Sequence, residues 1–190
     1  YLPEGSEVTF SHPIQGGIVT NELIAGKSMI GKAILGTLPG AIHITGGEIR
    51  LDGQDLLALR PAERRRVIGQ TAALIPQDPL TALNPVRRIG PQITRRLVDI
   101  LGWSKRDAEA RALELLAEVH IPDPARVMQS YPHELSGGMR QRVLIASAFA
   151  AEPKLIIADE PTTALDVTVQ KQILRLIKEM QQRHNTALLF

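Results

Sequence analysis

Hydrophobic residues recur along this chain in two patterns that predict different elements. Continuous apolar runs predict buried strands over residues 72–76, 154–159 and 186–190. The run at 154–159 is rich in β-branched residues and ends in acid, which is typical of a central parallel strand. Before residue 80, frequent Gly and Pro and alternating runs such as Gly47 to Gly53 predict strands and turns, interrupted by one helix.

Apolar residues at helical spacing predict the remaining elements. The predicted helices span Lys27 to Leu38, Arg87 to Leu101, Ser104 to Val119, Gly138 to Ala151, and Val167 to Gln182. Ser104 is the expected N-cap of its helix, with Asp107 in the first turn. Because strands and helices alternate, the fold class is α/β. Residues 84–135 are charge-rich and favour helix, which predicts a helical subdomain inserted into a core of residues 1–83 and 136–190.

Composition narrows the class of protein. The 190 residues are 44% hydrophobic and 22% charged, which fits a domain with a sizeable core and excludes a disordered tail. With 22 Lys and Arg against 20 Asp and Glu, the net charge is only +2, so bulk charge does not support nucleic-acid binding. There is no cysteine, which excludes disulfides and thiolate metal sites. No apolar run approaches the ~20 residues of a membrane span, so membrane association is expected to come through a partner.

Two short motifs concentrate candidate chemistry. Ser136, Gly137 and Gly138 precede a predicted helix, where a hydroxyl and side-chain-free amides at the helix N-terminus are able to meet a phosphate. Asp159 and Glu160 follow a predicted buried strand, at the strand end where open α/β sheets bind ligands. The alternatives are an ordinary helix-capping turn for the first motif and a turn-forming acidic pair for the second.

Together with Ala164-Leu165-Asp166, these motifs resemble the ATP-binding-cassette (ABC) ATPases over roughly residues 26–190. The resemblance implies a P-loop-type core with a parallel sheet flanked by helices, ATP and Mg²⁺ as cofactors, and ATPase activity. It implies that Ser136, Gly137 and Gly138 serve the ATP held by the opposite subunit. It assigns Asp159 to Mg²⁺ and Glu160 to general-base catalysis, and it places Asp166 in the loop at the dimer interface.

Further residues match the same family. Gln77 resembles the glutamine that contacts Mg²⁺ or the attacking water and links the nucleotide to the helical subdomain, although a lone loop glutamine is more often simply solvated. Gly26, Lys27 and Ser28 match the second half of the phosphate-binding G-x-x-x-x-G-K-[ST] loop, with Lys27 for the phosphates and Ser28 for Mg²⁺. Residues 21–25 depart from that loop, because Asn21 replaces its first glycine and bulky or acidic residues follow.

The segments 78–85 and 131–134 resemble the dipeptide, oligopeptide and nickel importers of the family in particular. The implied function is ATP hydrolysis that energises uptake of peptides or nickel. The implied partners are a second ABC ATPase subunit, a transmembrane permease that docks after Gln77, and indirectly a solute-binding protein, with no nucleic acid. The implied location is peripheral, on the cytoplasmic face of the inner membrane.

Two alternatives remain open from sequence. The atypical loop at residues 21–25, and an end at Phe190 before the family's switch histidine, favour a truncated or degenerate cassette without catalysis. A soluble ABC ATPase acting on nucleic acid shares the nucleotide motifs, but the importer-like helical region disfavours it.

Overall fold

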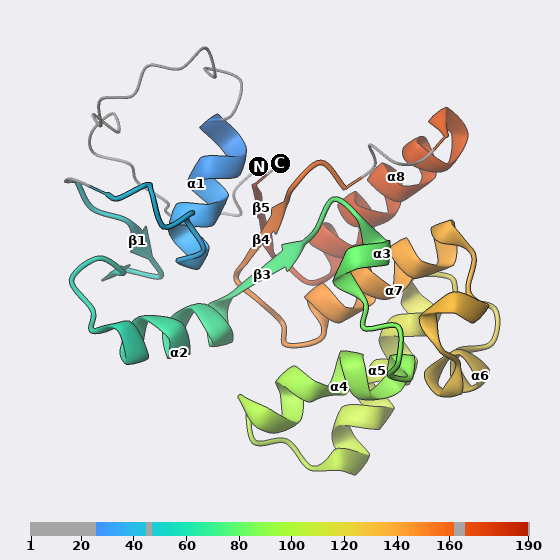
Figure 1. The fold of residues 1–190 in the computed structure, drawn as a ribbon. Helices are drawn as coiled ribbons and strands as arrows, with labels where there is room; N and C mark the ends of the chain where they lie inside the picture. The colour runs from blue at the N-terminus through green and yellow to red at the C-terminus, as the bar shows by residue number, and fades with distance from the viewer. Residues whose placement is uncertain (1–25, 45–46, 162–165, 190) are drawn as a thin grey trace.

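The computed structural model describes residues 26–44, 47–161 and 166–189 of the chain (Figure 1). The helices are α1 (Gly26–Leu35), α2 (Pro61–Thr71), α3 (Pro79–Ala82), α4 (Ile89–Asp99), α5 (Lys105–Glu118), α6 (Pro124–Gln129), α7 (Gly137–Phe149) and α8 (Val167–Arg183), with a 3-10 turn at Pro132–Glu134. The strands are β1 (Arg50–Leu51), β2 (Gln54–Asp55), β3 (Ala72–Ile75), β4 (Leu155–Ala158) and β5 (Ala187–Leu189).

A parallel sheet in the order β3-β4-β5 lies at the centre of the described fold. The central strand β4 is buried at every position, as its continuous apolar run predicts. The register pairs Ala72 with Leu155 and Ile75 with Ala158, so β3 and β4 end level with each other. Strands β1 and β2 form a separate antiparallel hairpin. The α/β class and the parallel sheet expected from sequence are confirmed.

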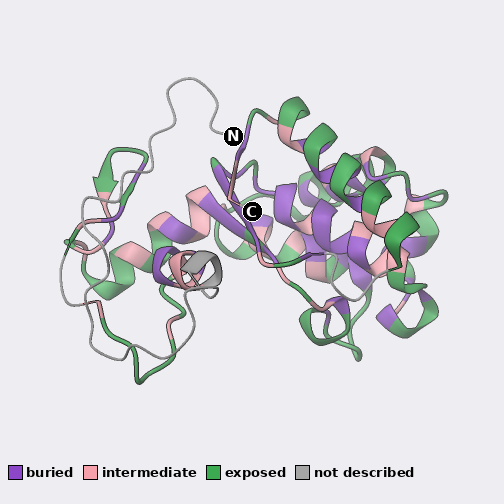
Figure 2. Cartoon of the chain, turned by 90° about the horizontal axis from the view of Figure 1, so that it is seen from above, coloured by how far each residue is buried: buried purple, intermediate pink, exposed green. Residues whose placement is uncertain are grey.

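Two hydrophobic clusters divide the core. One joins α1, α2 and the β1 hairpin to the sheet through residues such as Ile34, Leu56 and Ile157. The other joins the helices α4 to α8 to the sheet through residues such as Ile93, Phe149 and Ile156. Figure 1 and Figure 2 show the corresponding division, with α1, α2 and the hairpin to one side of the sheet and α3 to α8 to the other. The helices after β3 therefore share their buried interior with α7 and α8.

Side chains at the helix starts explain where several helices begin. Asp78, Ser104, Asp123, Ser136 and Asp166 each accept a hydrogen bond from a backbone N–H in the first turn of the helix that follows. The expected cap at Ser104 is thus confirmed, because its hydroxyl accepts from the Asp107 N–H at 3.1 Å. Glu63 supports the start of α2 by accepting from the Arg60 N–H at 3.3 Å.

Three parts of the sequence prediction differ from the structure. Helix α2 occupies a region in which only strands and turns were expected. Helix α1 ends at Leu35, three residues before the predicted end, because Gly36 takes a left-handed backbone (φ 68°) that stops the helix. Helix α4 is shorter at both ends than the predicted Arg87 to Leu101. Among the described residues, no helix is long and apolar enough to cross a membrane.

Polar contacts join helices α4 and α5 to other parts of the fold. Arg96 of α4 donates from Nε to the Gly69 carbonyl (2.9 Å) and from a terminal nitrogen to the Ala72 carbonyl (2.8 Å), where α2 meets β3. Burial lowers the pKa of this guanidinium. At the other end, His184 after α8 lies 2.8 Å from the Glu118 carboxylate at the end of α5.

Candidate functional site

Gln77 and Glu160 meet where the parallel strands end. The β3–β4 ladder continues one step past the strands, since the Asp159 N–H donates to the Ile75 carbonyl at 3.1 Å. Glu160 directly follows Asp159, and Gln77 lies two residues after Ile75. Gln77 Nε2 donates to Glu160 Oε2 at 3.2 Å. Both side chains are exposed, and Asp159 is half-buried. The structure therefore brings together residues 83 positions apart, at the edge where α/β sheets bind ligands.

The signature segment opens helix α7. Ser136 is the N-cap, and its hydroxyl accepts from the Met139 N–H at 3.3 Å. A methyl group added at Gly137 would meet no atom within 4 Å in the described part of the chain, and one at Gly138 would lie at an ordinary 3.8 Å from Val169 Cγ1. Neither glycine has a positive φ. Neither packing against the described residues nor the backbone angle requires glycine at these two positions, and Gly137 is exposed.

Asp166 performs a structural task in this fold. Its Oδ1 accepts from the N–H groups of Thr168 and Val169, both at 3.0 Å, and so caps α8. The side chain is exposed. This capping does not test the interface role expected from the sequence, which stays a prediction.

Gly26, Lys27 and Ser28 form the first turn of α1, as predicted, and their side chains lie outside the described part. Helix α1 packs closely on the central strand, because a methyl group at Gly31 would lie only 2.8 Å from Ile157 Cγ2. Glycine at 31 thus permits this close approach of helix and strand. The atypical loop at residues 21–25 lies outside the described residues.

Sequence reasoning missed one buried residue beside the acidic motif. Gln141 of α7 is fully buried, and its Nε2 donates to the Pro161 carbonyl at 2.7 Å. A single glutamine within a helix has no periodic signal, and its partner is 20 positions away. The available clue to a role for Gln141 was its position two residues beyond Met139, in the helix that begins at the Ser-Gly-Gly motif.

The residues at this edge fit a magnesium–nucleotide complex by their chemistry. Mg²⁺ in nucleotide sites is bound by one or two protein oxygens together with phosphate oxygens and waters. Asp159 supplies one carboxylate at the strand end. No group of three or more His, Asp or Glu residues that would by itself hold a metal ion occurs in the described part of the chain. A single protein carboxylate such as that of Asp159, together with phosphate oxygens and waters, matches the way Mg²⁺ is held in nucleotide sites.

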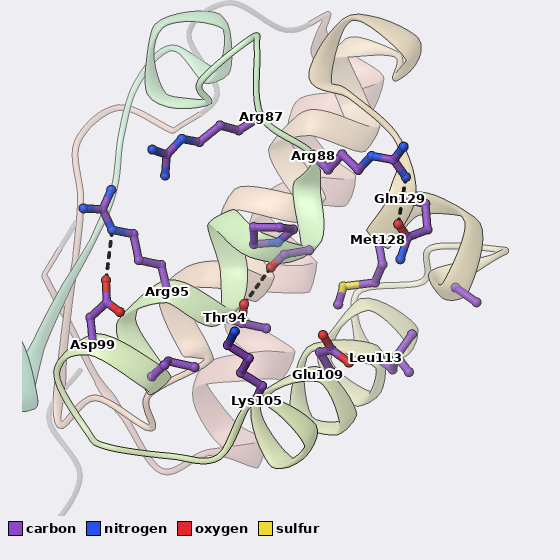
Figure 3. A pocket seen from close by; sticks show the side chains of 14 residues that line it. Arg87, Arg88, Thr94, Arg95, Asp99, Lys105, Glu109, Leu113, Met128 and Gln129 are labelled. Atoms are coloured by element: carbon purple, nitrogen blue, oxygen red, sulfur yellow. Dashed lines mark hydrogen bonds and ion pairs between the residues drawn. The ribbon is translucent and has the colours of Figure 1, made fainter.

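A separate cleft of about 680 Å³ lies among α4, α5 and α6 (Figure 3). Basic side chains predominate in its lining, which includes Arg87, Arg88, Arg95 and Lys105 against Asp99 and Glu109. Two of the arginines are already engaged, since Arg88 donates to Gln129 Oε1 at 2.8 Å and Arg95 pairs with Asp99 at 3.2 Å. Large apolar side chains are also exposed on this part of the fold, including Val86 at 80%.

The model of the ABC transporter family matches residues 25–163, and the chain belongs to this family. The match includes the Gly26 to Ser28 segment, Gln77, the signature segment and the acidic pair. Fold, ordered motifs and family model therefore agree.

Curated relatives are ATP-binding proteins of peptide transport. The chain is 52% identical to the probable D,D-dipeptide transport ATP-binding protein DdpD of Escherichia coli (strain K12), over 87% of this chain and 51% of the relative. It is 47% identical to the dipeptide transport ATP-binding protein DppD of the same organism, over 92% and 54%. It is also 47% identical to the oligopeptide transport ATP-binding protein OppD of Bacillus subtilis (strain 168), over 90% and 48%. The chain spans about half the length of these relatives.

Solved structures of ABC cassettes share the fold. A dimeric post-hydrolysis state of the ATP-binding cassette MJ0796, bound to ADP and Pi, superposes with a TM-score of 0.68 and 26% identity. The superposition covers 86% of this chain and 68% of that chain. A second dimeric structure of MJ0796, described as a bacterial ABC transporter cassette, gives 0.67 and 26% with the same coverage.

Proposed function

We propose that this chain is the nucleotide-binding region of an ABC importer subunit, which hydrolyses ATP to energise peptide uptake. The observation that carries the proposal is the contact between Gln77 and Glu160 at the carboxyl edge of the parallel sheet. The family match and the peptide-transport names of the relatives support the same reading. Nickel is a second solute class that the sequence resemblance allows.

Glu160 is the general base in this proposal. Its exposed carboxylate follows a rigid, buried strand, so that it is able to take a proton from a water that attacks the γ-phosphate. Gln77 holds one carboxylate oxygen through its amide and thereby orients the base. The Gln77 amide belongs to the loop between β3 and α3, so a shift of the helices after β3 would reach the base directly.

Different residues of the chain would bind different parts of the magnesium–nucleotide complex. Lys27 and the first amides of α1 would bind phosphate oxygens, and Ser28, Asp159 and Gln77 would hold Mg²⁺. When bound, the metal ion neutralises the charge that develops on the transferred phosphoryl group. Asp159, at the end of the buried strand β4, contributes a carboxylate whose backbone is fixed by the hydrogen bond from its N–H to the Ile75 carbonyl.

A second copy or a related subunit completes the site. Ser136, Gly137 and Gly138 would close on the ATP held by that subunit, and Asp166 would lie at the interface. The exposure of Gly137, with no atom of the described residues within 4 Å of an added methyl group, supports this assignment because it leaves room for a phosphate from the other subunit. The dimeric state of the similar cassette MJ0796 supports it as well.

The cleft among α4, α5 and α6 is the proposed docking surface for a transmembrane permease. It follows the Gln77 loop in the chain, and its excess of basic side chains suits a permease loop that carries acidic residues. Residues 84–135 would then act as the helical subdomain that connects permease and nucleotide. In this proposal the subunit lies at the cytoplasmic face of the inner membrane, held there by its partner.

The docking surface is tested by charge reversal in the complete transporter. Arg87→Glu should reduce co-purification with the permease at least about tenfold, because it reverses one of the basic charges that line the cleft. Arg106→Glu is the matched control, since Arg106 is exposed on α5 but does not line the cleft. Equal retention of the permease by both variants would contradict the docking proposal.

Hydrolysis is tested with the full-length protein and magnesium-ATP. Glu160→Gln keeps the shape of the side chain and removes the base, so turnover should fall about 100-fold or more while ATP still binds. Glu179→Gln on the exposed face of α8 is the matched control and should retain normal turnover. Turnover that survives Glu160→Gln would refute the assigned base. An unsubstituted protein without ATPase activity would favour the non-catalytic cassette.

A further inference from the structure

The backbone at Glu160 takes an unfavourable conformation. Its φ is 44°, in the left-handed region that non-glycine residues seldom occupy. The next residue is Pro161, and a residue before proline prefers an extended backbone with a φ near −120°. Such a conformation persists only where surrounding contacts hold it. The chain must therefore contain groups that fix the turn on which the proposed base sits.

Gln141 is the side chain that holds this turn from the interior. It is fully buried in α7, and its Nε2 donates to the Pro161 carbonyl at 2.7 Å. Because a carbonyl oxygen only accepts hydrogen bonds, the nitrogen of the amide must face Pro161. Gln77 contacts the same turn from the solvent side, at the Glu160 carboxylate. The turn that carries the base is thus held by two glutamine amides, one at the Pro161 carbonyl and one at the Glu160 carboxylate.

Gln141 is a costly choice for stability alone. Its Oε1 is buried and has no hydrogen-bond partner among the described residues. A buried acceptor without a partner destabilises the fold, and an apolar side chain of the same length would avoid this loss. Buried polar groups of this kind that oppose stability are expected at functional sites. The side chain is therefore better explained by the turn that it holds than by packing.

Gln141 also belongs to the helix that opens at the signature segment. Ser136 caps α7 five residues earlier, and Gly137 to Gln141 are consecutive residues of one regular helix. A movement of the α7 N-terminus therefore carries the Gln141 amide with it. Through the Pro161 carbonyl, that movement reaches the backbone of Glu160.

We infer that Gln141 is a positioning residue that fixes the Glu160 turn and couples the signature helix of this chain to its own general base. The inference rests on the proposed function, because it concerns the same reaction. It assigns to Gln141 no contact with nucleotide. Its effect is on the orientation of the base, so it acts on turnover and not on ATP binding.

The test is steady-state ATPase kinetics of the full-length protein with Gln141→Met. We expect kcat to fall about 10- to 100-fold, the loss typical of a displaced catalytic group, with KM for ATP unchanged within about twofold. The melting temperature should change by less than about 3 °C, since the lost hydrogen bond is offset by removal of the unpaired Oε1. Gln181→Met is the matched control, because Gln181 Nε2 also donates to a backbone carbonyl, that of Thr186 at 3.0 Å, away from the site.

A double substitution separates positioning from a general structural effect. If Gln141 and Gln77 hold the same turn, Gln141→Met should lower kcat by a smaller factor in a Gln77→Ala background than in the unsubstituted protein. Independent factors that simply multiply would overturn the inference. So would normal kcat in Gln141→Met, or failure of both Gln141→Met and Gln141→Leu to fold.

The outcomes also distinguish this inference from the proposed function. Hydrolysis that Glu160→Gln abolishes and Gln141→Met leaves intact would overturn only the role of Gln141. An unsubstituted protein that does not hydrolyse ATP would overturn both.

Discussion

Replacement of Gly137 by alanine separates what the fold needs from what the nucleotide site needs. Gly137 is the first residue of α7, and an added methyl group would meet no atom of the described residues within 4 Å. Its φ is not positive, so alanine adopts the native backbone without strain. The fold therefore tolerates Gly137→Ala, and the variant tests only what approaches the helix from outside.

The expected change in stability follows from chain entropy. A glycine-to-alanine substitution at a compatible position stabilises a protein by about 0.4–1 kcal/mol, because the unfolded chain loses freedom. For a chain of this size this raises the melting temperature by about 1–4 °C. Gly90→Ala gives the contrast, since its methyl group would lie 2.9 Å from the Met128 carbonyl oxygen, and overpacking of this kind costs about 1–3 kcal/mol.

The expected change in activity has the opposite sign. If the Gly137 amide meets a phosphate of ATP on the opposite subunit, the added methyl group displaces that phosphate, and kcat/KM for ATP should fall at least about tenfold. The assays are thermal unfolding without nucleotide and steady-state hydrolysis of magnesium-ATP by the full-length protein. A Gly137→Ala variant with normal kcat/KM would refute the role given to the signature glycines. A variant that unfolds more easily would refute the structural argument.

Two further substitutions test the polar contacts that join α4 to the α2–β3 junction and α5 to the end of α8. Arg96→Met leaves the Gly69 and Ala72 carbonyls without their donor, so the free energy of unfolding should fall by about 1–3 kcal/mol in urea denaturation; an unchanged value would contradict this role. Burial alone would raise the pKa of Glu118, but the hydrogen bond and charge of His184, with those of Arg183, outweigh burial and lower it. This stabilisation is present above the ordinary glutamate pKa of about 4.3 and is lost as the pH falls through the lower folded-state value. Urea denaturation at pH 7 and pH 3 should therefore find Glu118→Gln less stable at pH 7, with a smaller loss on acidification than the unsubstituted protein; equal losses would contradict the linkage.

The sequence predicts most elements that carry the motifs. The buried strand β4, the signature helix α7 and helix α8 lie where apolar periodicity and motif spacing indicate. Helix α2 was missed because its charged sequence, with three consecutive arginines from Arg64, has a weak apolar face amid Gly- and Pro-rich segments. The contact of Gln77 with Glu160 depends on the pairing of β3 with β4, which periodicity does not specify.

The roles of individual side chains depend on tertiary contacts in the same way. Asp166 matches a family motif, but only the folded chain reveals that its Oδ1 caps α8. Gln141 looks like any polar residue in a helix until the structure buries it against Pro161. Sequence spacing identifies residue types that suit a reaction, whereas strand register and helix packing decide which of them touch.

The central claim is that this chain binds ATP, and a titration of the full-length protein with magnesium-ATP tests it most directly. Saturation at about 100 times the dissociation constant stabilises a folded protein by about 2.7 kcal/mol. For a chain of this size, the melting temperature should therefore rise by about 5–10 °C, in the unsubstituted protein and equally in Glu160→Gln, which keeps the binding site. A melting temperature unchanged by millimolar magnesium-ATP in both proteins would contradict the account.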